Sequence, residues 1–257
     1  MCKLSHIIMR TFALIVFSVV FISGVSASNN LAQINDQDGF TNVRDSASSY
    51  SNIVGILTVE DFFVCIPSPS TWWRVTAFKN DSTGKQLSGY VHSSRIQLID
   101  SLDNTSKRAL LIKVLDRHKS MATEFHAAFT SKNSPAYKSS RAALEKHSEE
   151  NYTPILNTLS NYFCETGDTV VIQHFLAAII ADSGSANEMP CNALCQCYIC
   201  FPAAVISQVL QFKNLRQRAI LFEDIEYGLL NHYDVSEDGK SSNRDYLRLR
   251  EQLDKSR

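Results

Sequence analysis

The spacing of apolar residues changes once along this chain, near residue 100. Before that point, short runs rich in Val, Ile, Phe and Trp are separated by turn residues, a pattern typical of β-strands. The runs are Ile53 to Val59, Phe62 to Ile66, Trp72 to Phe78, Gly89 to Val91, and Ile96 to Ile99. Polar turns such as Asn80 to Gly84 lie between them. Five short strands are therefore predicted between residues 32 and 100.

From about residue 104 the apolar residues recur every three or four positions, which is the period of an amphipathic α-helix. The first stripe contains Leu110, Leu111, Val114, Leu115, His118, Met121, Phe125 and Phe129. Proline is favoured in the first helical turn, and it marks further helix starts at Ser134-Pro135, Thr153-Pro154, Met189-Pro190 and Phe201-Pro202. We expect six to eight antiparallel helices over residues 104–257.

Three later segments complete the helical prediction. Val170 to Ala181, capped by Asp168, is apolar nearly all round and is expected at the buried centre. Leu215 to Asn231 is amphipathic, and a charged final helix carries Tyr246, Leu249 and Leu253 on one side. The repeated helix pairs that begin with proline are similar to a HEAT-type array, but no convincing sequence repeat is found. The prediction is therefore an all-α bundle.

Three segments of the strand-rich region follow each other in a recognisable order. They are Asp38-Gly39-Phe40-Thr41-Asn42-Val43-Arg44, Trp72-Trp73-Arg74-Val75, and Gly89-Tyr90-Val91-His92-Ser93-Ser94-Arg95-Ile96. In this order they resemble a bacterial SH3-like domain of the SH3b (SH3_3) type over residues 32–100. Glu60-Asp61 departs from that pattern, because it replaces a glycine usual in the turn after the second strand.

The resemblance implies a small β-barrel, of the kind that exported bacterial proteins use to hold cell-wall peptides or partner proteins. The predicted fold class is thus α+β and multidomain, with an SH3-like barrel followed by the helical bundle. Glycine at position 89 fits a place where two strands approach closely.

Strand alternation sorts the side chains of this barrel into two faces. If Val75 points inward, Trp73 shares its face and Trp72 and Arg74 point outward; if Val91 points inward, Tyr90 and His92 point outward. An exposed Trp72 beside Tyr90 would form a rigid aromatic platform for a peptide. The candidate ligand-binding residues are Trp72, Tyr90, Tyr50, His92 and Arg74. Alternatively, both rings pack against the second domain.

The N-terminus indicates export. Lys3 and Arg10 supply positive charge before an apolar run, Phe12 to Ile22. Val25-Ser26-Ala27 then supplies the small residues of a cleavage site. Residues 1–27 are interpreted as a signal peptide, with an uncleaved membrane anchor as the alternative. The product is expected to be periplasmic or secreted, with no membrane span after cleavage.

The net charge of the chain limits the kinds of partner that it can bind. The formal net charge of the chain is −1, and removing residues 1–27 takes away two basic residues and no acidic ones. This balance argues against nucleic acid, which requires a concentrated positive face. The expected partner is a cell-wall peptide or an envelope protein, and the sequence does not indicate an oligomeric state.

Five cysteines of the helical region leave several interpretations open. Cys191, Cys195, Cys197 and Cys200 lie close together in the sequence, and Cys164 is a candidate disulfide partner for one of them. In an exported protein one or two disulfides are favoured over buried free thiols and over a metal site, since the spacing lacks paired C-x2-C knuckles. Cys65 is predicted to be a buried strand residue. We expect no metal and no cofactor.

A catalytic site is not expected. SH3b domains often accompany cysteine peptidases of the NlpC/P60 type, but the nucleophile turn of that family is absent, and Cys191 is only the least poor candidate. We interpret several charged or polar residues as solvated helix faces and not as catalytic groups: Glu124, His126, Glu223, Asp224 and Glu226. His118 is interpreted as a core histidine. The sequence favours a non-catalytic binding or adaptor protein. An inhibitor or immunity-type protein acting through the helices is the alternative, and a cell-wall hydrolase is a weaker one.

Overall fold

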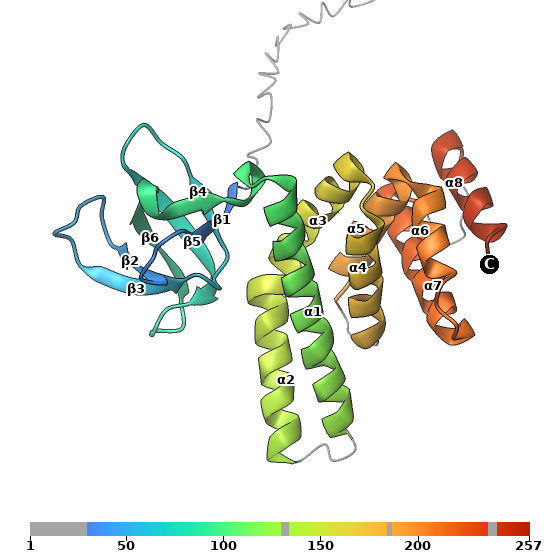
Figure 1. The fold of residues 1–257 in the computed structure, drawn as a ribbon, viewed down its shortest axis with the longest axis horizontal. Coiled ribbons are helices and arrows are strands. Elements are labelled where there is room, and N and C mark those ends of the chain that lie inside the picture. The colour runs from blue at the N-terminus through green and yellow to red at the C-terminus, as the bar shows by residue number, and fades with distance from the viewer. Residues whose placement is uncertain (1–29, 130–133, 184–186, 236–240) are drawn as a thin grey trace, which may run out of the picture.

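The computed structural model describes residues 30–129, 134–183, 187–235 and 241–257. An antiparallel β-sheet is followed by a row of α-helices, so the chain is an α+β protein (Figure 1). The predicted signal peptide, residues 1–27, lies outside the described residues. The sequence also predicts a helix-ending turn at 183–185 and a polar loop at 236–239, of which residues 184, 185 and 236–239 lie outside the described residues.

The sheet has seven described strands in the order β3-β2-β6-β5-β4-β1-β7. Their bounds are β1 (Asn30–Ile34), β2 (Phe40–Arg44), β3 (Ile53–Thr58), β4 (Phe63–Ile66), β5 (Trp72–Asn80), β6 (Gln86–His92) and β7 (Ile96–Leu98). The prediction of five strands was wrong, because it omitted β1 and β2. Both are only five residues long, and in neither do apolar and polar residues alternate strictly.

The sheet is open, so the closed barrel expected from the sequence is not formed. Within the described strands, β3 and β7 are the two edges and are not paired with each other. The sheet curls, however (Figure 1). Gln33 Nε2 of β1 donates a hydrogen bond to Val59 O, just beyond β3, at 3.3 Å. The concave side therefore encloses a core without a continuous hydrogen-bonded cylinder.

Strand alternation correctly predicted what this core contains. Val75 and Val91 are buried, and Trp73 packs against the same cluster. Cys65 is also buried there, as predicted. The core residues are Ala32, Ile34, Val43, Leu57, Phe63, Cys65, Val75, Ala77, Leu87 and Val91. Removing these apolar side chains from water is the main term that stabilises the curled sheet.

Gly89 marks the crossing of β2 over β6. A Cβ atom at this position would lie 2.4 Å from Arg44 O and 2.7 Å from Val43 Cγ1. Only glycine fits such a close approach between two backbones. The prediction of a close strand approach at Gly89 is confirmed.

The helices begin and end close to where the sequence places them. They are α1 (Asn104–Ala128), α2 (Pro135–His147), α3 (Thr153–Thr166), α4 (Thr169–Ala181), α5 (Met189–Cys200), α6 (Pro202–Val209), α7 (Leu215–His232) and α8 (Arg244–Asp254). Short 3-10 helices span Ser93–Arg95 (η1) and Ile99–Ser101 (η2), and a π-helical turn, Ser148–Tyr152 (η4), joins α2 to α3. Proline occupies the first turn of α2, α3, α5 and α6, because its missing amide has no intrahelical partner there.

Helices α1 and α2 lie side by side next to the sheet, and α4 to α8 follow on the far side of α1 (Figure 1). Asp103 caps α1, accepting hydrogen bonds from Thr105 N and Ser106 N, both at 2.9 Å. Helix α4 is buried at the centre, as predicted, with Asp168 as its N-cap. Leu31, Phe62 and Ile99 of the strand region join the same apolar cluster as the helices, so the sheet is packed firmly on the helical part. None of the described helices combines the length and apolarity needed to cross a membrane.

Candidate ligand-binding groove

The three motif segments of the strand region lie side by side. They fall on β2, β5 and β6, and β6 lies between the other two in the sheet. In the ladders, Trp72 is opposite His92, and Tyr90 is opposite both Arg74 and Arg44. Residues far apart in the sequence therefore form one continuous outward-facing surface.

This register changes the predicted aromatic platform. The ring beside Trp72 is that of His92, with centroids 5.4 Å apart and planes at 88°. Tyr90 lies two residues before His92 on β6, between Arg44 and Arg74 of the neighbouring strands. Trp72, Tyr90 and His92 are half-buried, and Arg74 is exposed. The aromatic pair at this surface is therefore Trp72 with His92, not Trp72 with Tyr90.

A groove of about 560 Å³ opens beside this pair. Its walls include Trp72 and His92 on one side and the outward residues of β2, Phe40, Asn42 and Arg44, on the other. Among the described strands, β2 is paired to β6 at the single position Arg44–Tyr90. The ladder between β2 and β6 does not continue past this pair, and the groove lies between the unpaired part of β2 and the end of β6.

Hydrogen bonds hold the groove side chains in place. Arg44 Nη1 donates to Ser51 O at 2.6 Å, and His92 Nδ1 lies 2.8 Å from Ser94 Oγ. Arg95 is ion-paired with Asp36. In the described part of the chain no carboxylate is ion-paired with Arg44, although the exposed Asp38 also lines the groove. A carboxylate of a ligand is the natural counterion for the guanidinium of Arg44.

The other predicted binding residues lie outside the groove. Tyr50 is 98 % exposed on the loop after β2, which an Asn52 to Asp45 side-chain hydrogen bond of 2.9 Å closes. Arg74 and Tyr90 share the outward face but do not line the groove. Phe40, Asn42 and Arg44 were not among the predicted binding residues, although the same alternation rule, applied from an inward Val43, places them on this face.

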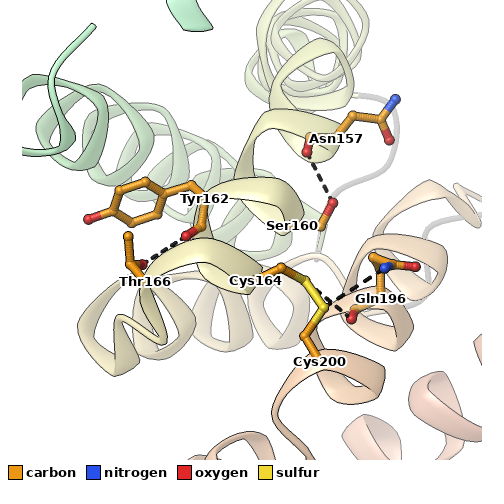
Figure 2. The surroundings of a disulfide bond; sticks show 7 residues. All are labelled: Asn157, Ser160, Tyr162, Cys164, Thr166, Gln196 and Cys200. Carbon is orange, nitrogen blue, oxygen red and sulfur yellow. Dashed lines mark hydrogen bonds between the residues drawn. A yellow bond between two sulfur atoms is a disulfide. The ribbon is translucent and has the colours of Figure 1, made fainter. Parts of the chain in front are cut away.

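The cysteines resolve into one disulfide and several thiols. Cys164 of α3 is bonded to Cys200 at the end of α5, with Cα atoms 5.4 Å apart (Figure 2). Cys65, Cys191, Cys195 and Cys197 are free. The prediction that Cys164 pairs with one of the four clustered cysteines is confirmed, and the structure selects Cys200.

Cys191 lies in a small pocket of about 250 Å³ that Tyr152, Asp182, Arg216 and Asp224 also line. Burial, together with the nearby Asp224 carboxylate, raises the pKa of the Cys191 thiol to about 12. A thiol with this pKa is almost fully protonated at neutral pH, whereas a nucleophilic cysteine requires the thiolate. His118 is fully buried, stacks on Tyr152 with centroids 3.7 Å apart and lies 3.3 Å from Asp182 Oδ2 through Nε2. It is a core histidine, as predicted.

The acidic residues of α7 do not form one exposed patch. Glu226 is ion-paired with Arg250 and Arg257, whereas Glu223 is exposed. Asp224 is half-buried near Cys191, and burial raises its pKa. Of the predicted binding residues, Trp72 and His92 line the groove of the β-sheet. No protein-family model, curated protein or solved structure matches this chain.

Proposed function

We propose that this chain is an exported, non-catalytic binding protein of the bacterial cell envelope, with the groove of its β-sheet as the binding site. The observation that carries the proposal is the Trp72–His92 pair beside the guanidinium of Arg44, which has no carboxylate partner in the described residues. Export is inferred from residues 1–27, and the periplasm or the exterior of the cell is the corresponding location.

The proposed ligand is a short cell-wall peptide. Trp and His rings offer flat apolar surface with few rotamers to lose on binding. Asn42 and Ser94 offer hydrogen-bonding groups to a peptide backbone, and Arg44 offers a charged partner to a carboxylate. Cell-wall stem peptides combine an exposed backbone with free carboxylates, so they match the hydrogen-bonding groups and the guanidinium of the groove.

The sequence resemblance to SH3b domains supports the same proposal, because its three segments border this groove. We extend it to an SH3-like ancestry for the curled sheet. We compare the row of helices with a HEAT-type array (Figure 1). It is proposed to dock a protein partner in the envelope.

A titration with a synthetic stem tetrapeptide tests the proposal. Residues 28–257 would be titrated while tryptophan fluorescence is recorded, and the Trp72→Ala variant would be followed by calorimetry. We expect Trp72→Ala to weaken binding about tenfold or more, as for a central aromatic contact. Tyr50→Ala is the matched control, since it removes an exposed ring that does not line the groove. Equal binding by the Trp72 variant and the wild type would refute the assignment.

A further inference from the structure

The far half of the α1–α2 hairpin carries an aromatic cluster. The Phe125 and Tyr137 rings have centroids 5.4 Å apart, the Phe129 and Tyr137 rings 5.9 Å, and the Phe125 and Phe129 rings 6.2 Å. Phe125 and Tyr137 are half-buried and Phe129 is 43 % exposed. The hairpin extends beyond the ends of the neighbouring helices (Figure 1).

These rings form one wall of a cleft of about 770 Å³. Its inner end is polar and is built from Thr153 at the start of α3 and Asp182 at the C-terminus of α4. The volume lies within the range of small-molecule sites, which is roughly 300–1,000 Å³. An apolar wall facing a polar end suits an amphipathic ligand.

The charges around the cleft favour a cation. Arg141 is paired with Glu145 at 2.7 Å, so these two largely cancel. Glu149 on the rim and Asp182 at the inner end are the remaining carboxylates of the lining, and His126 is exposed at the edge. The Asp182 side chain is only 15 % exposed and is positioned by the buried His118 through the 3.3 Å contact.

We infer that this cleft binds a small, soluble organic cation, an amine or quaternary ammonium group carried on an apolar body. Aromatic faces attract such cations through their quadrupole, most strongly where water is excluded. The carboxylates at the rim and at the inner end of the cleft also attract a cation. The inference concerns a second site, and it does not depend on the proposed peptide groove.

Three probes with one apolar body test the inference. Residues 28–257 would be titrated by calorimetry with (4-phenylbutyl)trimethylammonium, 4-phenylbutan-1-ol and 4-phenylbutyrate. We expect the cation to bind at least about tenfold more tightly than either of the others, which corresponds to a cation–π and charge contribution of ordinary size. Phe125→Ala and Glu149→Gln should each weaken cation binding severalfold. Glu165→Gln, an exposed carboxylate of α3 away from the cleft, is the control and should have no effect.

Several results would overturn the inference. They are equal affinity for the three probes, preference for the anion, or no cation binding at about millimolar concentration. Glu149 is exposed, so its variant tests the site even if Phe125→Ala alters the packing of the hairpin. Co-sedimentation with phosphatidylcholine vesicles, without binding of the soluble probe, would assign the cleft to a lipid headgroup and refute a small soluble ligand.

Discussion

The imidazole of His92 meets the indole of Trp72 at a right angle, with centroids 5.4 Å apart, across the β5–β6 ladder. His92 is itself held by Ser94, whose hydroxyl oxygen lies 2.8 Å from Nδ1. Trp72 is thus supported from the side, and the indole presents a fixed surface to the groove. Pre-organisation of this kind lowers the entropy lost when a ligand binds.

Replacing His92 by alanine should therefore release Trp72. An edge-to-face aromatic pair contributes about 0.5–1.5 kcal/mol, so we expect peptide affinity to fall roughly threefold to tenfold. In a Trp73→Phe background, steady-state fluorescence anisotropy reports Trp72 alone and should decrease in the His92→Ala variant. Unchanged anisotropy would show that His92 does not restrain the indole.

Gly228 allows α7 to approach α5 closely. A Cβ atom there would lie 2.4 Å from Cys195 Cβ and 2.6 Å from Cys191 O. Helix propensity alone predicts that Gly228→Ala stabilises the protein by about 1 kcal/mol. We expect a net loss of about 1–2 kcal/mol instead, because overpacking against a backbone carbonyl outweighs propensity. Urea unfolding measures the sign, and Ser139→Ala on the exposed face of α2 should be nearly neutral.

The Cys164–Cys200 disulfide links α3 to α5 across 36 residues of sequence. Closing a loop of this length restricts the unfolded chain and is worth about 3–4 kcal/mol in the chain-entropy model. We expect dithiothreitol to lower the free energy of unfolding of the wild type by that amount. The double variant Cys164→Ser, Cys200→Ser should have the same free energy of unfolding as the reduced wild type, whether or not the reductant is present. A wild type that is insensitive to the reductant would contradict the bond.

Stability should fall as the pH is lowered from about 6.5 towards 4. Burial, and next the neighbouring His118, lowers the pKa of His147 from 6.5 to about 4 in the folded protein. In that window the unfolded state binds the proton and the folded state does not, so protonation favours unfolding. The loss should reach about 2–3 kcal/mol and be absent above pH 6.5. Urea titrations at several pH values measure it, and His147→Gln should flatten the dependence.

The Cys191 thiol should react slowly with iodoacetamide. Its pKa of about 12 leaves little thiolate at pH 8, and Asp224 contributes to that shift after burial. Asp224→Asn should speed alkylation of Cys191 severalfold, as measured by mass spectrometry of native protein. Fast alkylation of the wild type near neutral pH would instead favour the hydrolase alternative.

Local patterns determined the elements of this protein. Proline in the first turn and the Asp168 cap placed the starts of most helices, because both act through backbone amides within one turn. Alternation sorted Val75 and Val91 to the core, since successive side chains on a strand point to opposite faces. Such signals failed for β1 and β2, because both strands are only five residues long and their apolar and polar residues do not alternate strictly.

Only the tertiary structure decided which residues meet. The ladder register placed Trp72 against His92 and left the sheet open, and helix packing chose Cys200 for Cys164. Packing of α4 beside α1 likewise brought Asp182 to the cleft lined by Phe125. Each of these contacts joins segments that are distant in sequence. Their geometry depends on how whole elements pack, and no short stretch of residues encodes it.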